Sequence, residues 1–571
     1  MIPPWPRAPL PAAACLLLVL LRPAPLEPQV PDATLLVPGA PVEAALSGGV
    51  RHRYAVHLPA GGYLDLRVEQ LGVDAVVALR SPAGVVVDEV DGPSGAAGEE
   101  RVVIGTAIRG RYVVEVREYQ PGPRGGRYRI RIEKTLTPAA NRRRLALERG
   151  ERSAVAAWLR GRAIPLASLS AEDTAMFGDA RVVALGEATH GSREFMEVRR
   201  QITMHLVRSR GFVRVALEGS VAEGERLDAY IQGAVGEDAR SVLLNQAFWI
   251  PRTAEMARRL DDLRTYNQGV EGDRRVRIVG VDPQDVQGYA ARIRAYLDDD
   301  GSIPTELAVA ARGALDTLEA ADREAARFGS SRLPASVRPS LVGLQEHLIS
   351  RRHRIEAANP GTAEPLVRAV TALIQFASFN SGAASRDRTR DAIMAENTLA
   401  VLHSAPAGTG VVLLAHNAHV AAARDSLGPT TTGGVLRSLI GARYFAVGMS
   451  FGGGSFLAQD VGSTAGALRV FGVAPAAEGT LDGDLGQVCR EPFFVSLVAA
   501  GAGPPEVRRW LARSTRMHWV GAMFSQAWGE WHAVREFAPG TSFDGLVYVP
   551  RSSPVEPLDT LADGVRTTRG R

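Results

Sequence analysis

The sequence predicts an α/β protein with a parallel sheet and a large helical insertion, preceded by a small all-β sandwich domain. In the second half of the chain, short hydrophobic runs alternate with segments of helical periodicity, which indicates strand–helix–strand units. Four of those runs end at an ionisable residue. In the first quarter, apolar residues alternate with period two between breaks rich in Gly, Pro and Asp, a pattern typical of a β-sandwich.

The composition indicates a globular protein of two or more domains. The chain has 571 residues, of which 46% are hydrophobic and 22% charged, so a sizeable core is available. The formal net charge is only +4, and no ladder of arginine and aromatic residues is present. We therefore expect no nucleic-acid partner.

The first 28 residues predict a secretory signal peptide. Arg7 precedes an apolar stretch from Leu10 to Leu21, which is shorter than the roughly 18 residues that a membrane-spanning helix needs. We expect a periplasmic or extracellular protein, and an uncleaved segment that anchors the chain to the membrane is the alternative. Removal of the segment would leave Cys489 as the single cysteine, so no intramolecular disulfide is expected.

The predicted domains follow from the shifts in pattern along the chain. The sandwich is expected to be an accessory domain for a polymer or protein partner, because none of its residues forms a catalytic pattern. The predicted ranges are 1–28 for the signal peptide, 38–136 for the sandwich, 137–162 for a linker helix, 163–552 for the α/β hydrolase domain and 553–571 for a disordered tail. Within the α/β domain, residues 284–404 are predicted as a helical insertion that covers the carboxyl edge of the sheet as a lid.

The four strand ends are predicted to meet at one site. The runs that predict these strands end at Glu187, Glu218, Asp282 and His416. Parallel strands place these ends at one edge of the sheet, where open α/β proteins bind ligands. The first end opens the string Gly186 to Gly191, which also contains His190 and leads into a helix with Ser192 as a good N-cap.

The residue types at this edge favour proton-transfer chemistry. A helix N-terminus beside His190 disfavours the imidazolium, so a neutral histidine is available as a base, with Glu187 and Glu218 orienting it or its water. Other groups must then stabilise a developing oxyanion. The candidates for that work are His416, His419, Arg199 and Arg390. Asp282 precedes a proline, where an aspartate often only fixes a turn.

Five ordered motifs resemble the erythromycin esterase family over roughly Val155 to Pro550. They are Val182 to Phe195, Ala216 to Glu218, Gly280 to Gln284, Arg390 to Asn397 and Ala415 to His419. The resemblance implies hydrolysis of a carboxylic ester, in named members a macrolide lactone, which would confer antibiotic resistance. It further implies His190 as a base that activates water without a metal or other cofactor, and Glu187 and Glu218 as its supports.

The same resemblance implies that His416, His419, Arg199 and Arg390 line the site of a small-molecule ester. The N-terminal region resembles the pre-peptidase C-terminal domain family, through a strand start at Tyr54 and a closing strand from Gly126 to Ile132. The sandwich and the export signal set this chain apart from the simplest esterases. The ester can therefore be another natural product or a polymer substituent.

Three alternatives compete with this interpretation. Glu187, His190, Glu218 and His416 are also a plausible ligand set for zinc or manganese in a metal-dependent hydrolase. Ser450 lies in a Gly-x-Ser-x-Gly string, which suggests a serine hydrolase, although glycines rather than a helix follow it. A non-catalytic exported binding protein is the third. If instead His190 is the base of an ester hydrolase, Glu218→Gln is expected to leave folding intact and to lower kcat about a hundredfold or more.

Overall fold

The computed structural model describes most of the chain beyond the predicted signal peptide. The described residues are 33–90, 97–119, 125–170, 172–234, 236, 238–246, 248–284, 286–299, 303–328, 333–380, 389–425, 428–462, 467–526 and 533–558. The predicted signal peptide and residues 559–571 of the predicted tail lie outside them. Within these ranges, none of the helices has the length and apolar character needed to span a bilayer.

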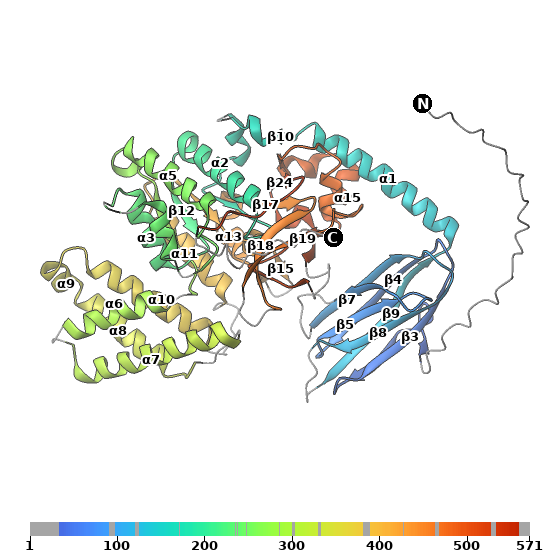
Figure 1. Ribbon diagram of the computed structural model, residues 1–571, viewed down its shortest axis with the longest axis horizontal. Helices are drawn as coiled ribbons and strands as arrows, with labels where there is room; N and C mark the ends of the chain where they lie inside the picture. Colours follow the sequence, from blue (N-terminus) through green and yellow to red (C-terminus); the bar gives the residue numbers. More distant parts are fainter. Residues whose placement is uncertain are drawn as a thin grey trace, which may run out of the picture. The chain divides into compact units, whose positions relative to one another are not determined.

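The chain divides into two compact units, Met1–Ala146 and Leu147–Arg571. The first unit contains a five-stranded sheet in the order β1-β3-β8-β5-β6 and a four-stranded sheet in the order β2-β9-β4-β7, counted over the described residues. The strands are β1 (Thr34–Leu35), β2 (Val42–Leu46), β3 (Arg51–Leu58), β4 (Tyr63–Leu71), β5 (Ala75–Arg80), β6 (Val86–Val90), β7 (Ala97–Gly105), β8 (Gly110–Glu118) and β9 (Gly126–Leu136). The predicted all-β domain is thus confirmed (Figure 1).

The period-two pattern of the sequence explains how this unit is held together. Alternate residues of β4, β5, β8 and β9 point inward and form one apolar cluster that includes Leu66, Val77, Val114 and Ile130. The hydroxyl groups of the buried Tyr54 and Tyr128 lie 2.6 Å apart and satisfy each other by a hydrogen bond.

The second unit is built on an eight-stranded sheet, again counted over the described residues. Its order is β10-β20-β24-β17-β11-β14-β12-β13, and the six strands from β24 to β13 run parallel. The strands are β10 (Ile164–Pro165), β11 (Val182–Leu185), β12 (Phe212–Leu217), β13 (Arg277–Gly280), β14 (Gly410–Leu414), β17 (Tyr444–Phe451), β20 (Phe493–Ser496) and β24 (Gly545–Val549). The predicted parallel sheet is therefore confirmed.

The register of this sheet brings the four predicted strand ends to one level. Leu185 pairs with Leu414, Leu414 pairs with Leu217, and Leu217 pairs with Gly280. The residues that follow these strands therefore leave the sheet at the same edge, as the sequence predicted. The central strands β11 and β14 are buried along their whole length, which explains why they appear in the sequence as continuous hydrophobic runs rather than as alternating ones.

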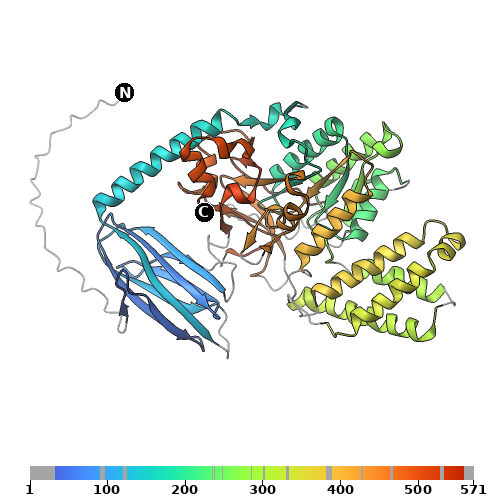
Figure 2. The same ribbon diagram turned by 180° about the vertical axis from the view of Figure 1, so that it is seen from behind.

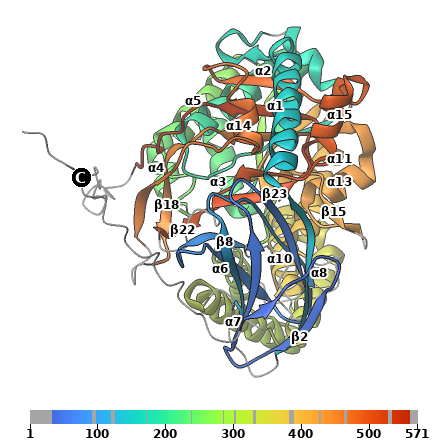
Figure 3. The same cartoon turned by 90° about the vertical axis from the view of Figure 1, so that its right-hand side faces the viewer.

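Helices cover both faces of the sheet. Figure 3 shows α2 (Arg193–Arg210) and α5 (Ala254–Gln268) on one side, and α11 (Arg390–Ser404) and α13 (Thr432–Ile440) on the other. Helix α2 begins after Ser192, as predicted, and ends at Gly211, which adopts the left-handed conformation (φ 65°) that glycine takes without steric cost.

The predicted helical insertion is a bundle with an apolar core of its own (Figure 2). It consists of α6 (Gln287–Asp299), α7 (Thr305–Phe328), α8 (Val337–Ser350), α9 (Arg352–Ala358) and α10 (Ala363–Phe379). The bundle packs against α3 (Val221–Ile231), where the Tyr289 hydroxyl accepts a hydrogen bond from the Ala222 N–H at 2.8 Å. Helix α11, which we had placed in the insertion, instead packs on the main core through Met394 and Val401.

Residues 553–558, predicted as the start of the tail, lie against the second unit. Ser553 donates backbone and hydroxyl hydrogen bonds to Glu194, and Val555 and Leu558 belong to the main core. The packed part of the chain therefore extends past the predicted boundary at residue 552.

Candidate active site

A cavity of about 480 Å³ opens at the carboxyl edge of the sheet. Its lining contains all eight residues that the sequence singled out: Glu187, His190, Arg199, Glu218, Asp282, Arg390, His416 and His419. From the predicted insertion only Gln284 and Arg390 line it, counted over the described residues, and neither belongs to α6–α10. The predicted lid is therefore corrected to a bundle beside the sheet, because its apolar faces are satisfied within the bundle and by α3.

Glu187 and His190 form a hydrogen-bonded pair in the turn between β11 and α2. The Nδ1 atom of His190 lies 2.8 Å from Oε1 of Glu187, and both side chains are buried. An ionised carboxylate only accepts hydrogen bonds, so Nδ1 carries a proton, and in the neutral imidazole Nε2 is then the acceptor. Among the described residues, no hydrogen-bond partner occupies Nε2, and the ring lines the cavity.

The glycines of this turn are required by close backbone contacts. A Cβ atom on Gly191 would lie 1.9 Å from the carbonyl oxygen of Leu457, and one on Gly186 would lie 2.1 Å from Oδ1 of Asn417. Both distances are far below van der Waals contact. Glycine is therefore required at both ends of the segment from Gly186 to Gly191, because other parts of the chain pack closely against this turn.

Arg199 holds the other oxygen of Glu187. Its guanidinium forms an ion pair with Oε2, and both side chains are at most 5% exposed. Burial by itself would raise the pKa of Glu187, but Arg199 and His190 together lower it to about 2. Glu187 is thus an anion at neutral pH, and the structure places Arg199 behind the carboxylate rather than directly beside His190.

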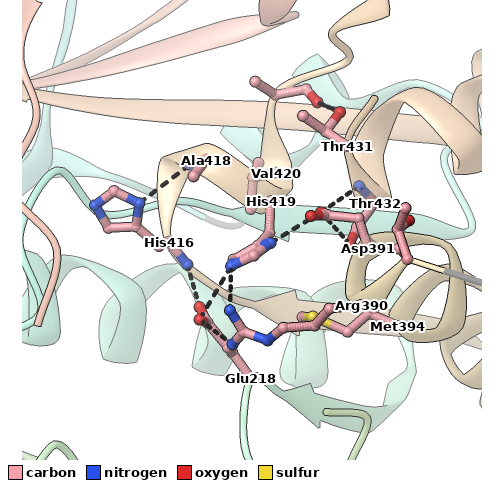
Figure 4. A network of polar contacts seen from close by, with 12 residues as sticks. Glu218, Arg390, Asp391, Met394, His416, Ala418, His419, Val420, Thr431 and Thr432 are labelled. Carbon is pink, nitrogen blue, oxygen red and sulfur yellow. Dashed lines mark hydrogen bonds and ion pairs between the residues drawn. The ribbon is translucent and has the colours of Figure 1, made fainter. Parts of the chain in front are cut away.

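Glu218 is the centre of a second polar network, shown in Figure 4. Its Oε1 atom accepts a hydrogen bond from Arg390 at 2.9 Å and lies 3.2 Å from Nε2 of His419. Its Oε2 atom accepts the backbone N–H of His416 at 2.7 Å. Burial would raise the pKa of Glu218, but His419, His190 and Arg390 hold it well below its usual range.

Two further carboxylates complete this network. Asp282 binds Arg390 through both oxygens, at 3.0 and 2.6 Å, so it does more than fix a turn. Asp391 accepts hydrogen bonds from Nδ1 of His419 at 2.9 Å and from the backbone N–H of Thr432 at 2.7 Å. Burial opposes a charge on His419, yet Glu218 and Asp391 raise its pKa to about 10, so it is an imidazolium at neutral pH.

His416 lines the cavity, and both of its ring nitrogens contact the backbone. It is the N-cap of α12 (Asn417–Val420), and its Nδ1 atom accepts the N–H of Ala418 at 3.2 Å. Its Nε2 atom therefore carries the proton and donates toward the carbonyl oxygens of Val520 and Ala188, at 3.2 and 3.3 Å. Burial and the nearby ring of His190 lower the pKa of His416 to about 3. Both nitrogens are engaged, so His416 positions the loops around His190.

Several residues that line the cavity are not among those predicted from the sequence. Arg259 of α5 is 3% exposed and lies on the same helical face as the core residues Met256, Leu260 and Leu263. An arginine on an apolar helical stripe is a signal of a buried cation that the sequence itself carries. An apolar wall that has no recognisable pattern in the sequence comes from the loop before α5 and from the short strand β22 (Met523–Phe524). Its residues are Phe248, Trp249, Ile250, Pro251 and Met523.

The surroundings of Ser450 do not fit the serine-hydrolase alternative. Ser450 is fully buried inside β17 and its hydroxyl donates to Asp482, so it is not exposed on a strand-to-helix turn. Across the described ranges, no three His, Cys, Asp or Glu side chains are grouped so as to hold a metal ion. The carboxylates at the edge of the sheet face guanidinium and imidazole groups instead.

The fold and site together define an α/β protein whose sheet edge carries a glutamate–histidine pair next to a buried charge network. Residues 207–552 match the erythromycin esterase family, a range longer than half of the chain. The chain belongs to this family, and the predicted membership is confirmed. The match includes Glu218, Asp282, Arg390, His416 and His419, whereas Glu187, His190 and Arg199 precede it.

Individual relatives are distant. The chain is 24% identical over 267 residues to an erythromycin esterase type II of Escherichia coli, covering 43% of this chain and 62% of that relative, which is less than two thirds of its length. A crystal structure of a Bacillus cereus protein aligns with a TM-score of 0.58 and 21% identity, over 71% of this chain and 99% of the other. An erythromycin esterase variant in its open conformation aligns with a TM-score of 0.50 and 17% identity, over 68% and 94%.

The N-terminal unit has a separate resemblance. A pre-peptidase C-terminal domain from a Bacillus anthracis collagenase aligns over 18% of this chain and 95% of its own length, with 18% identity and a TM-score of 0.15.

Proposed function

We propose that this protein hydrolyses a carboxylic ester, with His190 as the base that activates water. The observation that carries the proposal is the buried contact between Glu187 and Nδ1 of His190, on a ring that lines the cavity and whose Nε2 has no hydrogen-bond partner among the described residues. A carboxylate that holds Nδ1–H fixes the tautomer and stabilises the imidazolium that forms when Nε2 takes a proton.

The proposed reaction balances without a covalent enzyme intermediate. A water molecule gives one proton to Nε2 of His190 while its oxygen attacks the ester carbonyl carbon, which forms a tetrahedral oxyanion. Collapse of this intermediate breaks the bond to the alkoxy oxygen, and the imidazolium returns the proton to the departing alcohol. Arg390 and His419 are cationic donors in the lining, and we assign to their N–H groups the hydrogen bonds that stabilise the oxyanion.

The apolar wall supports an organic substrate of moderate size. Phe248, Trp249 and Met523 line the cavity together with the charged groups, and Phe248 and Met523 are 41% and 54% exposed. A cavity of about 480 Å³ with an apolar wall and a few polar groups is typical of small-molecule sites. We extend the proposal to an exported enzyme, because the first 28 residues have the pattern of a signal peptide.

A pair of variants tests the proposal. His190→Asn and Glu187→Gln are each expected to lower kcat for activated aryl esters by about two to four powers of ten, the usual scale for a general base. The control is His347→Asn, a change of the same kind in α8, which lies outside the cavity and is expected to leave kcat unchanged. Full activity of His190→Asn would exclude it as the base. Absence of turnover on aryl, alkyl and macrolide esters by the folded wild type would refute ester hydrolysis.

A further inference from the structure

One buried cation in the lining of the cavity has no role in the proposed reaction. Arg259 is 3% exposed, yet of its hydrogen bonds to described residues only one, from Nη2 to the carbonyl oxygen of Met196 at 3.1 Å, has an oxygen acceptor. Its other contacts are to the sulfur atoms of Met256 and Met196, which are weak acceptors, and its Nε is buried without a partner.

No carboxylate among the described residues forms an ion pair with Arg259. Glu187 is the nearest functional carboxylate on this side, and its Oε2 is already held by Arg199. Glu197 is held by Arg200. The guanidinium therefore remains a buried cation without a paired anion, which costs several kcal/mol unless an anion binds to it.

The charges in the lining are distributed unevenly. On the side formed by α2 and α5, Arg199 forms an ion pair with Glu187, whereas Arg259 has no ion-pair partner among the described residues. Glu223 also lines the cavity, and its carboxylate accepts the backbone N–H groups of Ser220 and Phe248 at 3.2 and 3.4 Å.

The opposite side has the reverse balance. There Arg390 and His419 are surrounded by Glu218, Asp282 and Asp391, so the network is complete without a ligand. An anionic group that enters the cavity is therefore favoured on the α2 and α5 side only.

We infer that Arg259 is a specificity residue that binds a carboxylate group of the substrate, next to the ester that His190 hydrolyses. The substrate class is then a half-ester or a related ester with a second, free carboxylate. A guanidinium is suited to this because its donors match the two oxygens of a carboxylate. The inference rests on the proposed ester hydrolysis and adds a requirement for negative charge on the substrate.

The kinetic test compares two esters of equal chain length. These are 4-nitrophenyl hexanoate, which is neutral, and the mono-4-nitrophenyl ester of adipic acid, which carries a free carboxylate. The wild type is expected to prefer the adipate ester in kcat/KM by about tenfold or more, as a charge-assisted hydrogen bond provides. In Arg259→Met the ratio of the two kcat/KM values is expected to fall toward one, and Arg259→Lys is expected to keep part of the preference.

The matched control is Arg258→Met, on the same helix. The Arg258 side chain is 51% exposed and contacts Glu255 at 3.3 Å, so its removal is expected to leave the preference unchanged. Methionine at position 259 would lie beside Met196 and Met256, so the unfolding midpoint of Arg259→Met is expected to equal or exceed that of the wild type. An equal rate loss for both esters, or a lower midpoint with the preference retained, would overturn the inference.

Direct binding separates this inference from the proposed function. Calorimetry with monomethyl adipate and with methyl hexanoate, carried out in the His190→Asn background, measures recognition without turnover. If the wild type hydrolyses neither ester, the proposed hydrolysis fails. Recognition of a carboxylate by Arg259 then stands only if monomethyl adipate still binds and Arg259→Met abolishes that binding. If the wild type hydrolyses both esters equally well, the proposed hydrolysis holds and the inference is refuted.

Discussion

Glu218→Gln provides the sharpest test of the charge network around Glu218. The sequence predicts that this variant folds as stably as the wild type, whereas the structure predicts a loss of stability. Glu218 accepts from Arg390 at 2.9 Å and lies 3.2 Å from Nε2 of His419, and its side chain is 12% exposed. Removal of one partner of a buried ion pair typically costs about 3–5 kcal/mol. Arg390 keeps Asp282 and His419 keeps Asp391, so we expect the lower end, about 3 kcal/mol, in the free energy of unfolding at pH 7.

The pH dependence follows from His419. Its pKa is raised to about 10 in the folded protein, compared with 6.5 ordinarily, so its stabilising contribution is fully present below pH 6.5 and is lost as the pH rises toward 10. In Glu218→Gln one of the two carboxylates beside the imidazolium of His419 is gone, so a rise in pH from 7 to 10 removes less stability from the variant than from the wild type. The difference between wild type and variant should therefore be largest near pH 7 and shrink toward pH 10.

The assay is urea unfolding followed by tryptophan fluorescence at pH 7 and pH 10. The sandwich region, residues 33–136, contains no tryptophan, so the signal reports on the second unit. Glu225→Gln is the control: Glu225 pairs with Arg292 and Arg368 at 27% exposure, and its loss should cost less than about 1 kcal/mol. An unchanged free energy of unfolding for Glu218→Gln, or the same difference at both pH values, would refute the network as described.

Two other predictions concern packing around the site. Ser450→Ala should keep the proposed ester hydrolysis, because Ser450 is not the nucleophile. It should lose about 1–3 kcal/mol of stability, because the buried Asp482 loses a hydroxyl donor. Labelling of Ser450 by a fluorophosphonate would contradict this prediction. Gly191→Ala should lower both the unfolding midpoint and kcat, since its Cβ would lie 1.9 Å from a backbone oxygen of Leu457 beside His190. Gly313→Ala, where a Cβ meets nothing within 4 Å, is the control and should be neutral or slightly stabilising, and equal behaviour of the two would contradict the packing argument.

The strand ends could be predicted from the sequence because a parallel sheet leaves few choices. The central runs are buried on both faces, and parallel pairing in register requires the residues after all four runs to meet at one edge. The roles at that edge could not be predicted in the same way. His416 and His190 both follow strands, yet His416 caps a helix and donates to loop carbonyls, whereas Nε2 of His190 has no hydrogen-bond partner among the described residues.

By itself, the sequence determined the two-part fold, the family and the set of eight polar residues at the sheet edge, since these depend on local periodicity and on motifs. Only the tertiary structure decided how these charges are paired: Asp282 with Arg390, Asp391 with His419, and Arg199 with Glu187. It also decided that the insertion forms a bundle beside the sheet and that Arg259 stays buried without a carboxylate. The physical reason is that ion pairs and cavity walls join residues far apart in the chain, and burial, which sets their energies, exists only after packing.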